Sequence, residues 1–510
     1  MKKIINYSLL AFMMLFIASC EKGLEDLNRN ETSPTSVDPV LLLNAAVINA
    51  SFPTQTVIFD MGTVQQLISP NGGVLAGANF NQESRDNSNM WAPYYQNVIK
   101  YTHDVVVNTD GVAARSNLNN MARIFQSYVF MVLTDEYGDI PYFQGGAGYS
   151  DQTFFPAYDR QQDIYQDIIQ QLSQASAALD PAGTIESQDA LYAGNIVKWK
   201  KFGYSLLLRA GMRLSKVDAA KAQSTVQAAF AGGVIMENAD NAYVRHDANY
   251  TFPIGNMLNG SEAANFYLTE PFVDQLKNTD DPRLGAIAVR YVGATSGNGQ
   301  TAAVASRDPA VQIGMPMGHD NGSIVGQATA DGLASFYDYS QVDRTRIVKT
   351  SSPSFFVTAS QTLLLLAEAT FKGWITSGSA EQYFADGIRA HMDQMALYDA
   401  ASAIDASDRE SYVTANPLMA SSELEQINTQ YWISSFLNGP EAFANFRRSG
   451  YPTLTPNPYG QPNNPDVPNG TFIRRLSYPN SELSVNTENV NAAVAAMGGD
   501  KLSTRVWWDQ

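Results

Sequence analysis

Carboxylate side chains come nearest, by type and spacing, to catalytic chemistry in this sequence. Asp135, Glu136 and Asp139 lie close together, and Asp280 precedes Asp281. Two carboxyl groups that face one substrate can act as acid and base in glycoside hydrolysis. The first cluster, however, sits where a predicted helix ends in a Gly-Pro turn, and acidic residues there usually cap, turn or face solvent. We therefore predict a structural role, with a carboxylate-dependent glycan-degrading enzyme as the less favoured alternative.

Other catalytic signatures are missing from the sequence. There is no GxSxG turn and no GxxxxGK[ST] phosphate loop. Residues 297–302 imitate a dinucleotide fingerprint, but they follow no convincing strand and open no helix. The four histidines are scattered and lack the spacing of metal ligands: His103, His246, His319 and His391. Paired carboxylates remain the one enzyme option that the composition does not reject. The missing motifs agree with a binding protein, and we expect no enzyme activity, no cofactor and no resident metal.

The single cysteine, Cys20, closes an apolar N-terminal segment. A short basic start precedes residues 4–17, which are mostly apolar but too short to span a bilayer, a task that takes about 20 residues. Two small residues stand directly before the cysteine, as in the lipobox of bacterial lipoprotein precursors. We predict that residues 1–19 are a signal peptide and that Cys20 carries the lipid anchor. A secreted protein with an incidental cysteine is the alternative.

Composition narrows the possible partners. The chain of 510 residues has 33 Lys+Arg against 50 Asp+Glu, a formal charge of −17 that would repel nucleic acid. Hydrophobic residues make up 45% and aromatic residues 11%, which is ample material for a core. Charged residues make up only 16%, against about 25% in an average soluble protein. We therefore expect a folded protein whose surface is rich in uncharged polar groups.

Apolar residues recur with a helical period over much of the chain, most clearly over residues 121–132. Asp38 followed by Pro39 is typical of a helix start, and the glycine pair 498–499 of a helix end. Asp159 with Gln162 resembles a capping box. Helices are expected at residues 90–107, 121–133, 159–179, 196–214, 218–230, 268–277, 356–373, 381–398, 422–437, 440–448 and 487–497.

Short turns separate several of these helices, which favours antiparallel helix pairs. Stacked pairs would form an all-α scaffold of the tetratricopeptide type, although no clean 34-residue consensus is present. Strand-like alternation is short, as at residues 242–245 and 287–292. After the signal peptide, the polar residues 20–37 read as a lipidated tether. Residues 38–510 are predicted to form a single α-helical domain.

Four long segments lack strong periodicity: residues 69–89, 245–267, 293–340 and 450–470. They are rich in Gly, Asn, Pro and Ser. Loops of this length are usually functional or disordered, and the aromatic residues that they carry argue against disorder. The loops are therefore the expected location of a ligand site.

The octapeptide DEYGDIPY at 135–142 resembles a hallmark of the SusD-like outer-membrane lipoproteins. Further segments resemble the same family in the same order, so that the likeness runs from the lipobox to the last residues. It looks closest to the second SusD-like subfamily. The other matching segments are 91–99, 158–165, 198–213, 281–284, 441–452, 474–479, and 486–490 together with 504–509.

The resemblance implies four tetratricopeptide-like helix pairs, with loops forming the ligand face. It implies a lipoprotein anchored in the outer membrane, facing the cell exterior, that lies as a lid over a TonB-dependent, SusC-like β-barrel transporter. Glu21, Glu25 and Asp26, just after Cys20, fit the export signals of such surface lipoproteins. The family's ligands are usually oligosaccharides and in some members peptides, so oligopeptide capture is the alternative.

A sugar presents flat C–H faces and a rim of hydroxyl groups. Aromatic rings on loops can stack on the faces, while Asn, Gln, Asp and Arg can hydrogen-bond to the rim. The predicted ligand-binding residues therefore lie in the variable loops: Phe80, Asn81, Asn256, Asn259, Phe266, Tyr337 and Tyr339.

Motif residues are expected to be scaffold, because large aromatic side chains are mostly buried and arginines pair with carboxylates or cover rings. The aromatic set is Trp91, Tyr95, Tyr142 and Trp199; the arginine set is Arg447, Arg448, Arg474 and Arg475. A loop cation such as calcium stays open at Asp320, Asp331 and Asp338, but no EF-hand spacing supports it.

Overall fold

The structure is a computed structural model, which describes residues 37–510 except 74, 76, 81–89, 460–465 and 469. The predicted signal peptide, nearly all of the tether, the lipidation site Cys20 and the predicted ligand contact Asn81 lie outside the described residues. The chain divides into Met1–Asp38 and Pro39–Gln510, and the description below concerns the second unit. The domain boundaries derived from the sequence stay predictions.

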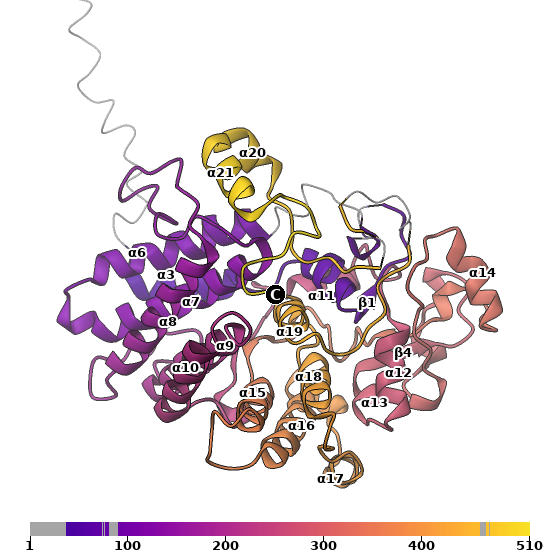
Figure 1. Cartoon of the computed structure of the whole chain (residues 1–510). Helices are drawn as coiled ribbons and strands as arrows, with labels where there is room; N and C mark the ends of the chain where they lie inside the picture. Colours follow the sequence, from indigo (N-terminus) through magenta and orange to yellow (C-terminus); the bar gives the residue numbers. More distant parts are fainter. Residues whose placement is uncertain (1–36, 74, 76, 81–89, 460–465, 469) are drawn as a thin grey trace, which may run out of the picture. The chain divides into compact units, whose positions relative to one another are not determined.

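Within the described residues, ten helices form the main stack, in agreement with the predicted all-α scaffold (Figure 1). Within it, α6 packs on α7, α7 on α8, α8 on α9 and α9 on α10. Helix α15 packs on α9, α16 and α18, and α19 follows on α18. The bounds are α3 Pro39–Asn49, α6 Lys100–Thr109, α7 Ser116–Tyr137, α8 Gln161–Ala178, α9 Ile196–Arg213, α10 Ala219–Gly232, α15 Ala359–Phe371, α16 Ala380–Tyr398, α18 Glu423–Ser434 and α19 Gly439–Ser449.

Shorter helices and strands lie in the segments that connect the helices of the stack or follow them. They include α4 Met61–Thr63, α11 Pro253–Asn259, α12 Glu270–Asn278, α13 Arg283–Ile287, α14 Ser323–Ala330, α17 Ala406–Ala415, α20 Asn480–Val485 and α21 Thr487–Met497. The strands are β1 Leu67–Ile68, β2 Ala242–Val244, β3 Tyr267–Leu268, β4 Ala288–Tyr291, β5 Ala305–Ser306, β6 Gln341–Val342 and β7 Ser354–Val357. They pair antiparallel as β1–β3, β2–β7 and β5–β4–β6.

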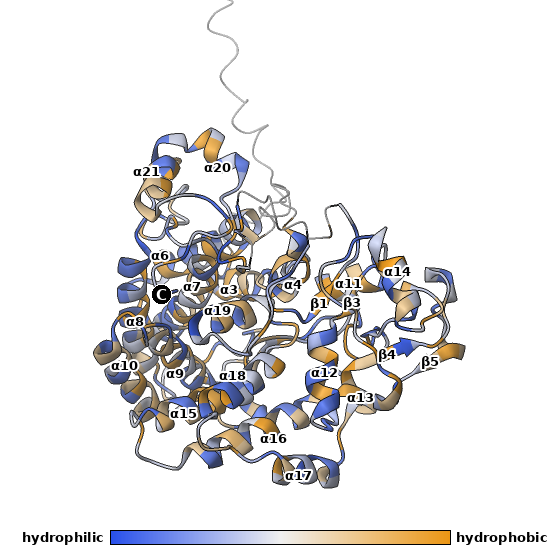
Figure 2. Ribbon diagram, turned by 45° about the vertical axis from the view of Figure 1, so that its right-hand side comes forward, coloured by the Kyte–Doolittle hydropathy of each residue, from blue (hydrophilic) through white to orange (hydrophobic). Residues whose placement is uncertain are grey.

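Helix α8 shows why the periodicity analysis works. Ile164, Ile168 and Leu172 recur every fourth residue and are buried, so one stripe of the helix faces its neighbours α7 and α9. Figure 2 shows the resulting mixture of hydrophobic and hydrophilic residues along the helices of the stack.

The start of α8 corrects the predicted capping box. Asp159 does not cap the helix, because its backbone pairs with Ile140 and its carboxylate accepts the backbone N–H groups of Tyr142 and Phe143, each at 2.9 Å. Asp139 supplies the cap instead, since its Oδ1 accepts the N–H of Gln161 at 2.9 Å. The DEYGDIPY segment is therefore a structural corner that joins α7 to α8.

A buried ionic cluster joins α7, α9 and α19. Arg213 contacts Asp135 at 3.1 Å and Glu441 at 2.6 Å, and all three side chains are buried. Tyr165 donates to Asp135 at 2.5 Å, and the indole of Trp508 donates to it at 2.8 Å. Burial opposes charge on Glu441, but Arg209 and Arg213 lower the pKa of Glu441 below its ordinary value. The predicted capping or solvent-facing position is wrong for Asp135, because its charge is matched inside the core.

The motif side chains are scaffold, as predicted. Trp91, Tyr142 and Trp199 are buried, and Tyr95 donates its hydroxyl to the carbonyl of Pro141 at 2.7 Å. The four motif arginines also have partners. Arg448 makes two bonds to Glu368 at 2.8 and 2.7 Å, Arg475 pairs with Asp500, Arg474 pairs with Asp509, and Arg447 covers the ring of Phe443.

The buried Glu136 leads to a pH prediction. Burial raises the pKa of Glu136 from 4.5 to about 8, and burial followed by the nearby Glu136 charge raises the pKa of Asp60. Because the pKa of Glu136 is raised in the folded state, its protonated carboxyl group contributes stability that is fully present below pH 4.5. This contribution is lost as the pH rises from 4.5 toward 8. Glu136→Gln cannot ionise, so its unfolding free energy should exceed that of the wild type by about 1–3 kcal/mol more at pH 8.5 than at pH 5.

Urea unfolding of both proteins at the two pH values measures this difference. Parallel pH profiles for wild type and Glu136→Gln would contradict the assignment of a protonated, buried carboxyl group at neutral pH.

Candidate functional site

Loop segments that are distant in sequence meet beside α11. A Cβ built on Gly297 would lie 2.9 Å from Ala264 Cβ and 3.8 Å from the Tyr337 ring, so these residues are direct neighbours. Gln300 donates to the carbonyl of Tyr337 at 3.0 Å. We call this surface, formed by residues 260–265, 294–300 and 335–338, the loop face; α11 leads directly into its first segment.

Two adjacent aromatic rings form a platform on the loop face. Phe336 and Tyr337 stack with centroids 4.1 Å apart and an interplanar angle of 29°, and both rings are half-buried. Tyr267 supports Phe336 edge-on at 6.3 Å. Such a pair presents an apolar surface that is held in place before any ligand arrives.

Buried polar contacts fix the turn that carries this platform. Ser335 accepts the N–H of Tyr337 at 3.1 Å and donates to the carbonyl of Ala294 at 2.8 Å. Asp338 is buried and pairs with Arg290 at 2.9 Å, and it also accepts the N–H of Gly293. The aromatic pair is therefore attached to β4 and its following loop rather than to a free chain segment.

Asn256 and Asn259 supply amides from the exposed side of α11. Asn256 donates to the hydroxyl of Thr251 at 2.6 Å. Asn259 donates to the carbonyls of Gly255 at 2.8 Å and Val348 at 2.7 Å. With their nitrogens engaged, the side-chain carbonyl oxygens of both asparagines can accept hydrogen bonds from a ligand. Asn256 and Asn259 therefore lie exposed on α11, the helix that leads into residues 260–265, which meet Gly297 and Tyr337.

Phe80 belongs to a different group of segments. It is half-buried and has φ 65°, a left-handed conformation that is uncommon for a bulky residue. The preceding Asn79 donates to the carbonyl of His319 at 3.0 Å and accepts from Asn457 at 2.8 Å. Phe80 is therefore held beside the segments around residues 319 and 457, and no described contact joins it to Tyr337.

Phe266 and Tyr339 are core residues. Phe266 is 2% exposed and Tyr339 is 0% exposed, and the Tyr339 hydroxyl donates to Asp331 at 2.5 Å. Phe266 directly precedes β3 and belongs to the main hydrophobic core, whereas Tyr339 lies two residues before β6 and belongs to a smaller buried cluster. Neither ring offers a face to a ligand in this structure, which argues against these two predicted contacts.

Comparison with known proteins identifies the family. The profile of the family described as "Starch-binding associating with outer membrane", the second SusD-like family, matches residues 30–479. The chain belongs to the SusD-like family. This confirms the resemblance drawn from the DEYGDIPY segment and the motifs that follow it.

Solved structures agree with the fold. A chitin-binding protein is 30% identical with a TM-score of 0.80, covering 93% of this chain and 100% of its own. A SusD homologue from Bacteroides ovatus is 23% identical with a TM-score of 0.76, covering 92% and 99%. A chitin-binding SusD homologue from Flavobacterium johnsoniae is 24% identical with a TM-score of 0.72, covering 92% and 97%. No curated protein sequence matches this chain.

The three aspartates considered for a loop cation have separate roles in this SusD-like protein. Asp320 accepts the N–H groups of Gly322 and Ser323 at the start of α14, Asp331 accepts from Tyr339, and Asp338 pairs with Arg290. Across the described parts of the chain, no three His, Cys, Asp or Glu side chains gather into a possible metal site. Nor is any helix there long and apolar enough to cross a membrane.

Phe336, Asn265 and Gln300 also belong to the loop face but are not among the predicted ligand-binding residues. Phe336 carried a usable signal, because it is an aromatic residue directly beside Tyr337 in a segment rich in Gly, Asn and Ser. Asn265 donates to Glu262 at 2.6 Å, a local pairing that its spacing of three residues allows. Gln300 has no such signal, since its position depends on a contact with a residue far away in sequence.

Proposed function

We propose that this SusD-like protein captures oligosaccharides at the loop face without cleaving them. The observation that carries the proposal is the fixed, half-exposed Phe336–Tyr337 pair, and the exposed amides of Asn256 and Asn259 on α11 support it as nearby candidates for hydrogen bonding. A pyranose ring can stack on the pair while the amide oxygens accept from its hydroxyl groups. The relative that is 30% identical is named as chitin-binding, so fragments of chitin are the first ligands to test.

The buried carboxylates support capture without catalysis. Asp135 and Glu136 are sealed in the core, and Asp139 is engaged in capping α8. A glycosidase needs two carboxyl groups that reach either side of one glycosidic bond. The segment that came nearest to this chemistry in the sequence therefore has another use in the fold.

Affinity electrophoresis tests the ligand class. The purified protein is run through native gels that contain glycol chitin, soluble starch or no polymer, and free oligopeptides are added as competitors. Capture of glycans predicts retarded migration in at least one polysaccharide gel, no release by peptides, and no shortened sugars after incubation. Unchanged migration in both gels, with tight binding of the peptides, would favour oligopeptide capture instead.

We further propose that the protein is anchored to the outer membrane through Cys20 and delivers its ligand to a SusC-like transporter. Labelling with radioactive palmitate should mark the wild type and leave Cys20→Ala unlabelled. A Cys20→Ala protein that keeps the label and the membrane fraction would contradict this anchor.

Three exposed aromatic side chains in one segment are our candidates for the proposed transporter contact. Tyr149, Phe154 and Phe155, in the segment between α7 and α8, are 86%, 70% and 62% exposed. Large exposed apolar side chains commonly mark protein interfaces. Phe154→Ser combined with Phe155→Ser should reduce co-purification of a large β-barrel from membranes by at least fivefold, with unchanged glycan binding. Equal recovery of the barrel with both proteins would place the contact elsewhere.

A further inference from the structure

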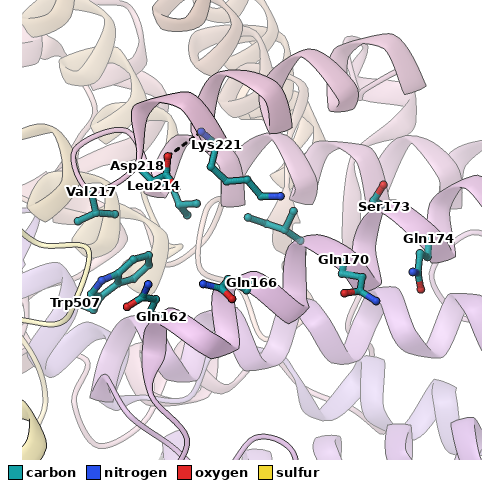
Figure 3. A pocket seen from close by; sticks show the side chains of 11 residues that line it. Gln162, Gln166, Gln170, Ser173, Gln174, Leu214, Val217, Asp218, Lys221 and Trp507 are labelled. Atoms are coloured by element: carbon teal, nitrogen blue, oxygen red, sulfur yellow. Dashed lines mark hydrogen bonds between the residues drawn. The ribbon is translucent and has the colours of Figure 1, made fainter.

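A groove of about 690 Å³ lies on the helical stack, on residues that the loop face does not use. One wall is the outer side of α8, and the other is the corner between α9 and α10. Figure 3 shows the glutamines in a row along α8, with Trp507 at one end. Residues that line the groove include Gln162, Gln166, Gln170, Leu214, Lys221 and Trp507.

The glutamines repeat every fourth residue. A helix rises 1.5 Å per residue, so carboxamides at positions 162, 166 and 170 follow one another at about 6 Å along one face. In the part of the chain that the structure describes, none of these three amides bonds to another protein group, whereas Gln174 beyond them accepts from Arg123 at 3.3 Å. The row therefore offers a line of free donors and acceptors.

The C-terminal segment holds Trp507 at the end of this row. The neighbouring Trp508 is buried and bonded to Asp135 at 2.8 Å, which fixes the backbone, while Trp507 keeps a half-exposed ring. Tyr165 contacts the Trp507 ring with centroids 6.4 Å apart. Trp507 and Gln162 also line an adjoining groove of about 410 Å³, so the surface continues beyond the tryptophan.

The chemistry of the lining selects a neutral, hydroxyl-rich ligand. Lys221 and Asp218 carry opposite charges, and most of the other polar groups are uncharged. An indole stacks on C–H faces, and carboxamides both donate to and accept from hydroxyl or N-acetyl groups. Leu214 and Ile169 give the groove an apolar floor.

A peptide fits this groove less well. An extended peptide usually adds to a free strand edge, but both walls here are helices. A helical peptide needs a hydrophobic groove for its apolar stripe, whereas this one is lined by a row of amides. The lining therefore favours a glycan chain over a polypeptide.

We propose that the glutamine groove is a second oligosaccharide-binding site, in which a sugar ring stacks on Trp507 and the following rings bond to Gln162, Gln166 and Gln170. The site shares its ligand class with the proposed function but not its residues. A chain held at the groove would extend over the helical stack, away from the contacts made by Tyr337.

Calorimetry with chitohexaose and maltohexaose separates the two sites. The proteins are the wild type, Tyr337→Ala, the pair Gln166→Ala and Gln170→Ala, and all three substitutions together. Gln382→Ala, an exposed helical glutamine on α16, is the matched control. Pentaglycine serves as the probe for a peptide backbone. The substituted glutamines are exposed, so folding should be unaffected, and circular dichroism verifies this.

The inference predicts that Tyr337→Ala retains saturable sugar binding and that adding the glutamine pair lowers this remaining affinity at least tenfold. Trp507→Ala should act in the same direction, and Gln382→Ala should have no effect. Complete loss of binding in Tyr337→Ala alone would overturn the groove while leaving the loop face intact. If sugar binding is lost in the Gln166→Ala, Gln170→Ala protein and unchanged in Tyr337→Ala, the result supports a sugar site in the groove and contradicts one on the loop face. If the protein binds pentaglycine but no sugar, and the Gln166→Ala and Gln170→Ala substitutions abolish this binding, the groove is a peptide site and not an oligosaccharide site.

Discussion

Replacing Arg213 with methionine is expected to lower the free energy of unfolding by about 3–5 kcal/mol. The guanidinium of Arg213 is fully buried. It balances part of the negative charge of two buried carboxylates, Asp135 at 3.1 Å and Glu441 at 2.6 Å. Burial opposes the charge on Arg213, but Glu441 and Asp135 raise the pKa of Arg213 well above its ordinary value. Methionine fills similar space without a charge, so the substitution leaves two carboxylates short of a partner in the core.

Arg505→Met is the matched control for this prediction. Arg505 also pairs with a buried carboxylate, Asp509, at 3.0 Å, but its own side chain is 50% exposed. Water can replace much of such a contact, so the loss should stay within about 1 kcal/mol. Urea unfolding of the three proteins compares them directly. Equal losses for the two variants would show that the Arg213 cluster does not hold the helices together.

Tyr337→Ala is expected to weaken binding of a captured oligosaccharide at the loop face by at least tenfold. The substitution removes one ring of a stacked pair whose partner, Phe336, remains in place on Tyr267. Aromatic anchors at a site centre commonly contribute about 2 kcal/mol or more, which is more than a factor of ten in affinity. Tyr337→Phe keeps the ring face and should retain most of the affinity. Calorimetry on the Gln166→Ala, Gln170→Ala background isolates this site.

Tyr149→Ala serves as the control, since Tyr149 is an exposed tyrosine between α7 and α8, on a segment that does not contribute to the loop face. On the Gln166→Ala, Gln170→Ala background, Tyr149→Ala should leave the affinity for the oligosaccharide unchanged. If the Tyr337→Ala protein binds the sugar as tightly as this control, the Phe336–Tyr337 platform does not contribute to sugar binding.

The helical scaffold was predictable because burial on one side imposes a period on the sequence. Helix α8 follows this rule, with its apolar stripe packed against α7 and α9. The predicted helix at residues 356–373 shows the limit, because the structure gives Ser354–Val357 to β7, which pairs with β2, and starts α15 at Ala359. A distant strand partner decided that boundary, and local periodicity contains no information about it.

The candidate site was predictable only in part. The aromatic-rich segments 245–267 and 293–340 supply the loop face, but they also contain the helices α11 and α14. Which of their rings turns outward depends on contacts between distant residues. Tyr337 remains half-exposed beside Gly297, whereas Tyr339, two residues later, is buried and bonded to Asp331. The glutamine row of α8 was readable as a four-residue repeat, yet outward glutamines resemble a solvated helix face until Trp507 is placed at their end.

A crystal structure with bound chitohexaose would separate capture at the loop face from cleavage or binding elsewhere, because it shows both where the sugar lies and whether it is intact. We expect an unbroken oligosaccharide with a pyranose ring stacked on the Phe336–Tyr337 pair and hydroxyl groups within hydrogen-bond distance of Asn256 or Asn259. A cleaved sugar, or a loop face left empty at saturating ligand while the sugar binds elsewhere, would contradict it.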